Sequence, residues 1–316
     1  MLKDKKILFI SPPYFSYPDI IKSGIESQRA KVDLFYSQPV GAISKFAAVC
    51  STRIYDKLKE RYFKVLHERI KGPYDYVLII RADLIPEEFI GFLRHNNPGS
   101  IFIQYLWDDV GLFPALLDTF QYFNRILSYN IHDSKKYGLV FRPFFFIPDD
   151  EPLGEKPKKY DLFFIGIFHT DRLKVIEEIM LQNPGIKLYL HFYISVITFL
   201  KKGIPLKKLK LFRFRKMNYK EMIRIVKSSS AVLDIPKPLQ KGLSTRIFEA
   251  MGAGAKVITT NEKVREYEFF NNNFLIIDRD KPLVNKEWLT LPFKDYENGL
   301  LSGYHVSTWI FDVFIK

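Results

Sequence analysis

The stretch from Gly242 to Glu249, GLSTRIFE, combines the residue types that are needed to bind an anion. It follows the apolar run AVLDI, which predicts a strand, and it contains the start of a short helix. Ser244 or Thr245 is expected to cap this helix, whose first amides and dipole favour negative charge. Arg246 adds a cation whose planar donors suit a phosphate. The pattern predicts a phosphate site beyond the carboxyl end of a strand.

Glu249 lies one turn further along the same predicted helix. The residues three positions after the cap are apolar, so the pattern is not a capping box and Glu249 is not required at the helix start. Its carboxylate could therefore accept hydrogen bonds from a ribose diol. The alternative is a surface ion pair between Arg246 and Glu249, which would contribute only about 0.2–0.5 kcal/mol.

Three familiar signatures of nucleotide or metal sites are either missing or misplaced in this sequence. Gly252 and Gly254 have the spacing of a dinucleotide fingerprint, but a helix precedes them and a strand follows, which is the reverse of the required order. They are expected to end the helix and turn the chain into the strand. No Walker loop occurs. The letters DRD at Asp278–Asp280 match a metal motif of GT-A transferases, yet they lie later in the chain than such a site would.

A second loop, IGIFHTDR, has the same strand-to-helix polarity. Gly166 follows a predicted buried strand, and Arg172 lies in the first turn of the helix that follows. This arrangement makes Arg172 a second candidate for a phosphate contact, next to Gly166. His169 is expected to be a loop histidine and not a catalytic group.

The N-terminal half offers acidic groups and a histidine at predicted strand ends. Asp108 and Asp109 in YLWDDVG follow a strand, a position that suits a general base acting on a hydroxyl group. Capping of the following turn is the alternative for both. His132 is a second candidate for the base, whereas Asp133 is expected to cap a short helix.

The elements that would position these residues alternate between apolar strands and amphipathic helices, which predicts parallel sheets covered on both faces. One long amphipathic helix is expected from about 43 to 70. A segment rich in prolines and charges interrupts the alternation at 146–159. The predicted fold class is α/β, with two doubly wound Rossmann-like domains that face a cleft. The expected boundaries are 1–147, a linker at 148–159, a second domain at 160–302, and a C-terminal helix at 303–316 that packs back across the junction. Ligands of such folds bind beyond the carboxyl ends of the strands.

The composition of the sequence limits the cellular compartments in which the protein is expected. The 316 residues are 47% hydrophobic and include a single cysteine, Cys50, so a disulfide framework is excluded. The N-terminal run KKILFIS indicates a first strand and not a signal peptide. The longest mostly apolar stretch, 188–200, is too short to cross a bilayer core of about 30 Å. A cytoplasmic protein is expected.

The net charge of +13 is concentrated in one segment. The stretch 201–216, KKGIPLKKLKLFRFRK, holds eight basic residues and no acidic one, interleaved with leucines and phenylalanines. Such a segment could lie on an anionic membrane surface. Nucleic-acid binding is less well supported because it rests on this segment alone. The remaining interpretation is a solvated basic face beside a core strand.

The layout AVLDI…Q.GLSTRIFEAMGAGAKVITTN resembles the donor half of GT-B glycosyltransferases, especially bacterial enzymes that build lipopolysaccharide core and capsule. The runs YDLFFIG…DR and FISPPYFSYPDII resemble the openings of the two domains in that group, and the RfaS type of core biosynthesis protein is the nearest subgroup. The resemblance implies a metal-independent enzyme that moves a sugar from a nucleotide sugar to a lipid-linked or oligosaccharide acceptor. The enzyme would work in the cytoplasm or at the inner face of the cytoplasmic membrane.

The resemblance also implies roles for individual residues. Glu249 would contact the ribose of the donor. The diphosphate would be held by the preceding loop and helix start, which comprise Gln240, Gly242, Ser244, Thr245 and Arg246. Many retaining members carry a further glutamate eight positions before the first, where this chain has Lys241. The stereochemical outcome therefore stays open.

Two alternatives remain from the sequence. A nucleotide-sugar epimerase of the same fold would also carry acidic and histidine residues near a donor site. A two-domain protein that binds a ligand or nucleic acid without catalysis belongs to a different class.

Overall fold

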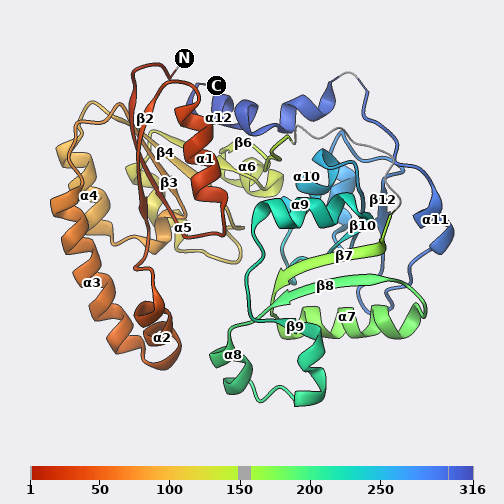
Figure 1. The fold of residues 1–316 in the computed structure, drawn as a ribbon. Coiled ribbons are helices and arrows are strands. Elements are labelled where there is room, and N and C mark those ends of the chain that lie inside the picture. Colours follow the sequence, from red (N-terminus) through yellow and green to blue (C-terminus); the bar gives the residue numbers. More distant parts are fainter. Residues whose placement is uncertain (1, 149–157, 298, 316) are drawn as a thin grey trace. The chain divides into compact units, whose positions relative to one another are not determined.

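The computed structural model describes residues 2–148, 158–297 and 299–315 (Figure 1). The chain divides into two compact units. Unit 1 comprises Met1–Pro143 together with Trp309–Lys316, and unit 2 comprises Phe144–Thr308. Most of the expected linker lies outside the described residues. Each unit contains one six-stranded sheet, and all the strand pairs in both sheets are parallel. The two doubly wound α/β domains predicted from the sequence are therefore present.

The sheet of unit 1 has the strand order β2-β1-β3-β4-β5-β6. Its strands are β1 (Lys6–Ser11), β2 (Lys31–Tyr36), β3 (Tyr76–Ile80), β4 (Ile101–Leu106), β5 (Arg125–Ser128) and β6 (Val140–Phe141). Its helices are α1 (Tyr17–Glu26), α2 (Ala42–Cys50), α3 (Thr52–Arg69), α4 (Glu87–Asn96), α5 (Leu116–Thr119), α6 (Ile131–Tyr137) and most of α12 (Val306–Phe314). Ile7 in the interior strand β1 pairs with Val32 on one side and Tyr76 on the other. The apolar run of β1 is fully buried because helices cover both faces of a parallel sheet.

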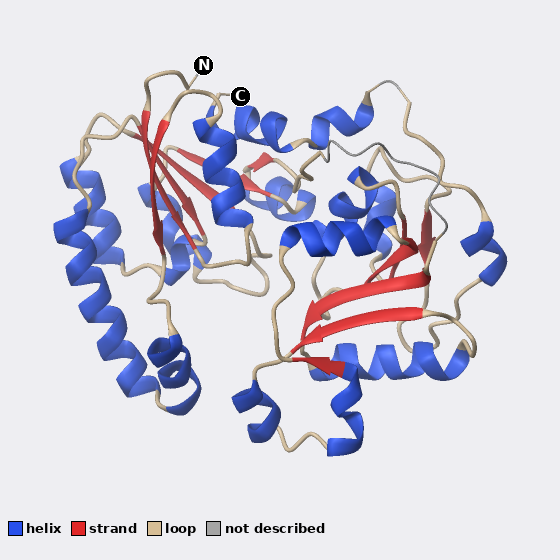
Figure 2. Cartoon of the chain, viewed as in Figure 1, coloured by secondary structure: helices blue, strands red, loops and turns tan. Residues whose placement is uncertain are grey.

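The sheet of unit 2 has the order β12-β11-β10-β7-β8-β9. Its strands are β7 (Tyr160–Ile167), β8 (Leu188–Tyr193), β9 (Phe212–Arg213), β10 (Ser229–Asp234), β11 (Lys256–Thr259) and β12 (Phe274–Ile276). Its helices are α7 (Thr170–Gln182), α8 (Val196–Lys201), α9 (Tyr219–Lys227), α10 (Thr245–Gly252) and α11 (Lys286–Thr290). Figure 2 shows α7 on one face of this sheet and α9 and α10 on the other. When the strands are numbered from the start of this unit, their order is 6-5-4-1-2-3, which is the Rossmann order. The order reverses direction between the first strand, β7, and the fourth, β10.

Two local predictions were wrong. The long helix expected from 43 to 70 is two helices, α2 and α3, because Ser51 adopts an extended conformation and its hydroxyl accepts from the amide of Ile54. Asp133 does not cap α6. Asn130 caps it by accepting from the amide of His132, and Asp133 instead accepts from the amide of Val110 at 2.8 Å.

The C-terminal helix returns to the first unit. Trp309 of α12 is fully buried, and its ring lies 4.9 Å from that of Tyr105 in β4. Asp312 of the same helix forms an ion pair with Arg142, at 3.2 Å. These contacts place the last turns of the chain in the core of unit 1, although unit 2 precedes them in the sequence.

The two glycines at the end of α10 differ in their roles. Gly254 has a φ of +65°, so it makes the left-handed turn into β11, as expected. Gly252 is still helical, and Ala253 is the residue at the C-cap position. A Cβ on Gly252 would lie 2.3 Å from Cδ2 and 2.9 Å from Cβ of Phe146. Phe146 cannot easily retreat, because its main chain bonds to Tyr304 and Val306.

We expect Gly252→Ala to lower the free energy of unfolding by about 1–3 kcal/mol, because the added methyl group overpacks the contact with Phe146. Gly91→Ala in α4 is the matched control, since nothing lies within 4 Å of its Cβ position. That change should be neutral or stabilising, by up to about 1 kcal/mol. Thermal unfolding of the two variants measures both effects. Equal melting temperatures would contradict the packing role of Gly252.

Candidate functional site

The strand order of unit 2 reverses between β7 and β10, and connections that diverge at such a point leave a crevice at the carboxyl ends of the strands. The charged residues at this edge include one aspartate and three arginines. Asp234 is the last residue of β10, Arg172 and Arg246 lie in the first turns of α7 and α10, and Arg279 follows β12. The sequence predicted Arg172 and Arg246 as ligand contacts, but not the other two.

Asp234 is fully buried. Its Oδ1 accepts from the Ser244 hydroxyl at 2.7 Å and from two nitrogens of Arg246 at 2.9 and 3.1 Å. Its Oδ2 accepts from the hydroxyl of Thr259, the last residue of β11, at 3.1 Å. A buried carboxylate needs several such donors, because it has lost its hydration. Asp234 thereby joins the ends of β10 and β11 to the start of α10.

These bonds change the role expected for the start of α10. Ser244 occupies the N-cap position, but its hydroxyl donates to Asp234 and its side chain does not cap the helix amides. Arg246 pairs with Asp234 and not with Glu249, which excludes the alternative of a surface pair between Arg246 and Glu249. The Arg246 side chain remains 16% exposed, whereas Glu249 is buried. The helix start thus presents one partly exposed guanidinium beside amides that the Ser244 side chain leaves uncapped.

Arg172 and Arg279 flank this helix start. Arg172 is buried, and it donates to the carbonyls of Ile235 at 2.7 Å and Ile167 at 3.3 Å. Arg279 forms an ion pair with Asp171 in the first turn of α7, and its side chain is 24% exposed. Both arginines therefore brace the loops that follow β7 and β10.

The arginines and aspartates of this cluster influence one another electrostatically. Burial, followed by the positive charge of Arg246, lowers the pKa of Arg172 to about 10. Arg279 lowers the pKa of Arg172 further, and the carboxylates of Asp234 and Asp171 oppose these effects only in part. Three guanidinium groups thus face two carboxylates. A bound anion would offset the remaining charge.

Three other residues that were predicted to bind the donor substrate are Gly166, Gln240 and Thr245, and their surroundings differ. Gly166 lies within β7, where a Cβ would meet the Phe164 ring at 2.8 Å, so packing alone accounts for this glycine. The Gln240 side chain donates to the carbonyl of Gly242 at 3.3 Å and folds the loop onto itself. Thr245 is the first residue of α10 and is half-buried.

Unit 1 carries a second polar cluster at the point where its own strand order reverses, between β1 and β3. Arg81 follows β3 in a left-handed conformation, with a φ of +58°. Its guanidinium pairs with Asp83 at 2.7 Å and with Asp108, and it lies 3.9 Å from the Phe113 ring centroid. Tyr14, after β1, donates to Asp108 at 3.3 Å, and burial followed by the charge of Asp108 raises the pKa of Tyr14.

The three predicted catalytic residues differ in accessibility. The Asp108 side chain is 22% exposed, and one of its oxygens accepts from Arg81 and Tyr14. Asp109 is buried and accepts a hydrogen bond from the Tyr129 hydroxyl, so its carboxylate is poorly accessible to a ligand. His132 is half-buried within α6. Asp108 is therefore better placed than Asp109 to meet a substrate hydroxyl.

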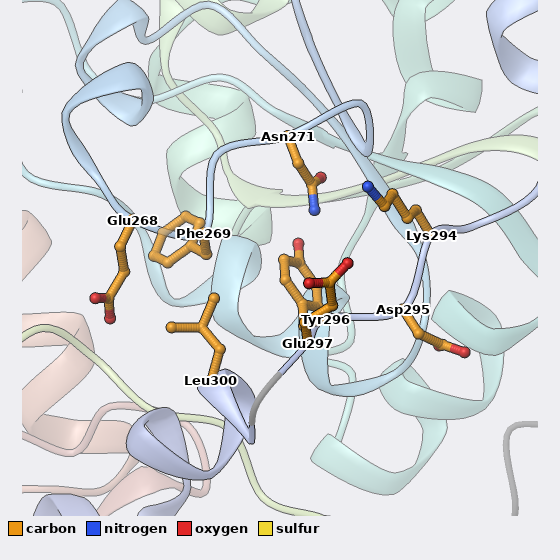
Figure 3. Close-up of a pocket in the computed structure, with 8 residues that line it drawn as sticks. All are labelled: Glu268, Phe269, Asn271, Lys294, Asp295, Tyr296, Glu297 and Leu300. Atoms are coloured by element: carbon orange, nitrogen blue, oxygen red, sulfur yellow. The ribbon is translucent and has the colours of Figure 1, made fainter.

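A cavity of about 380 Å³ in unit 2 lies at a different edge. It is lined by Glu268, Phe269, Asn271, Lys294, Asp295, Tyr296, Glu297 and Leu300 (Figure 3). Asn273, which precedes β12, bonds to the main chain of Lys294 on the wall of this cavity. The cavity therefore lies at the amino ends of the strands, away from the arginine cluster.

The DRD letters form a turn. Asp278 Oδ1 accepts from the amides of Asp280 and Lys281, both at 2.7 Å, and these bonds lower the pKa of Asp278. Within the described ranges, no group of three histidine, cysteine or acidic residues is arranged to hold a metal ion. The part of the chain that the structure describes also contains no helix that meets the length and hydrophobicity needed to cross a bilayer.

The sequence matches no protein-family model and no curated protein. The fold is similar to solved structures. The α,α-trehalose-phosphate synthase (UDP-forming) from Burkholderia xenovorans matches with a TM-score of 0.60 at 12% identity, over 96% of this chain and 98% of that one. AviGT4, a glycosyltransferase involved in avilamycin A biosynthesis, matches with a TM-score of 0.53 at 13% identity, over 98% and 93%. At such identities the likeness is one of fold, and it confirms the predicted GT-B-type pair of Rossmann-like domains.

We expect Asp234→Asn to destabilise the protein strongly, because it leaves Arg246 without its carboxylate. The loss should fall near the lower end of the roughly 3–5 kcal/mol that is typical of broken buried pairs, since Arg246 keeps some contact with solvent. Asp171→Asn is the matched control. Its ion pair with Arg279 is more exposed, so that change should lower stability by about 0–1 kcal/mol. Urea unfolding of both variants provides the comparison, and equal losses would refute the organising role of Asp234.

Proposed function

We propose that the protein is a glycosyltransferase that moves a sugar from a nucleotide-sugar donor to a hydroxyl group. The observation that supports this function most directly is the arginine cluster of unit 2. Arg172, Arg246 and Arg279 surround the start of α10 at the strand reversal, where folds of this type bind ligands. The excess positive charge and the uncapped helix amides suit a diphosphate.

In this mechanism the donor diphosphate lies against Arg246, Arg279 and the first amides of α10. These groups stabilise the negative charge that develops on the leaving nucleoside diphosphate as the glycosidic bond breaks. The guanidinium groups supply charge that a divalent metal supplies in other transferases. Asp234 acts as a positioning residue, because it holds Arg246 and Ser244 without facing the ligand. The contact of Glu249 with the ribose stays a prediction.

Asp108 is our candidate for the base that removes the proton from the acceptor hydroxyl in an inverting reaction. Arg81 and Tyr14 fix the orientation of its carboxylate by bonding to one oxygen. The second oxygen is left to face the hydroxyl. Asp109 and His132 remain secondary candidates for this role.

For the acceptor, we propose a bacterial surface glycan, either lipid-linked or a free oligosaccharide, as in the synthesis of lipopolysaccharide core, O-antigen or capsule. The motif resemblance to transferases of these pathways supports this assignment. A nucleotide-sugar epimerase would use the same donor site, but it would convert its substrate without an acceptor. Isomerisation of a nucleotide sugar in the absence of any acceptor would therefore point to the epimerase.

We expect one nucleoside diphosphate among UDP, GDP, dTDP and CDP to raise the melting temperature in the presence of EDTA. At a concentration of about 100 Kd, the ligand would stabilise the native state by about 2.7 kcal/mol, or roughly 5 °C or more. Arg279→Gln and Arg246→Gln should each reduce this shift, because they remove a diphosphate contact. Arg265→Gln, an exposed arginine elsewhere in unit 2, should leave the shift intact.

Thermal unfolding with each nucleotide measures this effect. The absence of a shift with all four nucleotides would exclude the donor site, and so would a loss of equal size in the Arg265→Gln control.

A further inference from the structure

A basic segment of unit 2, 196–216, extends from the edge of its sheet. It contains α8, a 3-10 turn at Leu206–Leu211 and the edge strand β9 (Figure 1). Three buried side chains anchor it to the core: Phe199, Leu211 and Phe212. The rings of Phe199 and Phe212 lie 5.7 Å apart, and that of Phe212 stacks on Phe192 of β8 at 5.5 Å. These contacts hold the backbone of the segment against the core of unit 2. The exposed side chains of the segment therefore point away from that core.

The cations of this segment are only partly neutralised. Lys208 pairs with Glu177 at 2.6 Å, and Arg215 pairs with Glu221 at 2.8 Å. Both carboxylates come from outside the segment, which contains eight basic residues and no acidic one. Its exposed lysines include Lys202, Lys207 and Lys210. Beside these ion pairs, the exposed Lys202, Lys207 and Lys210 give the segment a positive surface.

The same segment also carries exposed apolar side chains. Leu206 is 76% exposed and Leu200 is 69% exposed. Val196, Leu209 and Phe214 are also exposed. Exposed apolar groups that are interleaved with cations, and not scattered singly, mark a contact surface.

Protection of the sheet edge from pairing with other chains does not account for this mixture of cations and exposed leucines. Charged residues on an edge strand such as β9 hinder pairing with other chains, which could explain the lysines. Exposed leucines have the opposite effect on association. Nucleic acid would also attract the cations, but leucine and valine side chains offer no stacking surface to bases. A partner that combines negative charge with a hydrocarbon phase satisfies both features.

We infer that segment 196–216 docks onto an anionic phospholipid surface. Lys202, Lys207 and Lys210 contact the headgroup phosphates, and Leu200 and Leu206 enter the boundary of the acyl chains. A groove of about 280 Å³, lined by Lys207, Lys208, Lys210, Leu211, Met180 and Glu177, adjoins this surface. The docking surface goes beyond the proposed glycosyl transfer and does not depend on it.

Vesicle flotation of the full chain tests this inference. The protein should float with vesicles of phosphatidylcholine and phosphatidylglycerol, but not with phosphatidylcholine alone, and high salt should weaken the binding. Replacement of Lys202, Lys207 and Lys210 by glutamine should reduce vesicle affinity about 100-fold. Leu200→Ser with Leu206→Ser should also reduce it, because the apolar contribution is lost while the charge is kept.

A matched control changes the same charge elsewhere in unit 2, at Lys174, Lys220 and Lys281, which are exposed. This triple glutamine variant should bind vesicles like the wild type. An equal loss in the control would show a general charge effect and overturn the inference, as would a wild-type protein that fails to float. Binding to a labelled oligonucleotide that persists in the leucine variant and displaces the vesicles would assign the surface to nucleic acid instead. Flotation needs no nucleotide, so its outcome is distinguishable from a failure of the donor site.

Discussion

The arginine cluster of unit 2 depends on one buried carboxylate. Asp234 has no exposed surface, so each of its oxygens must find donors within the protein. The donors come from Ser244 and Arg246 at the start of α10 and from Thr259 at the end of β11. This requirement fixes the direction in which α10 leaves the sheet. It also explains why the helix has no side-chain cap, since the residue at the cap position serves Asp234 instead.

Unit 1 also has a buried charged residue at its strand reversal, but the charge has the opposite sign. At its strand reversal the buried ion is a cation, Arg81, and its partners are the carboxylates of Asp83 and Asp108. Its left-handed backbone is an unfavourable conformation that the surrounding ion pairs hold in place. A buried anion in unit 2 leaves arginines partly exposed, and a buried cation in unit 1 leaves an aspartate partly exposed. The sign of the buried ion thus sets the chemistry that each sheet edge offers.

The sequence predicted the strands and the two-domain class well, because apolar runs and their alternation with helices are local patterns. The prediction of an anion site rested on strand-to-helix polarity, which is also local. The partners of Arg246 were not predictable in this way. Asp234 resembles any polar residue at a strand end, and its bonds to Arg246 and Thr259 exist only after the sheet has formed. The break at Ser51 was missed because apolar periodicity continues through it, while the serine hydroxyl favours a local bond.

The charge balance of the arginine cluster would link the binding of an anion to folding. Arg172, Arg246 and Arg279 exceed the carboxylates of Asp234 and Asp171 by one charge, and burial followed by the positive charge of Arg246 lowers the pKa of Arg172. A diphosphate carries more than one negative charge, so it would neutralise the surplus and still require further donors. The uncapped amides of α10 are suited to supply them. Arg172 and Arg279 donate to carbonyls of the loop that follows β10, so an anion that binds these guanidinium groups would also stabilise that loop.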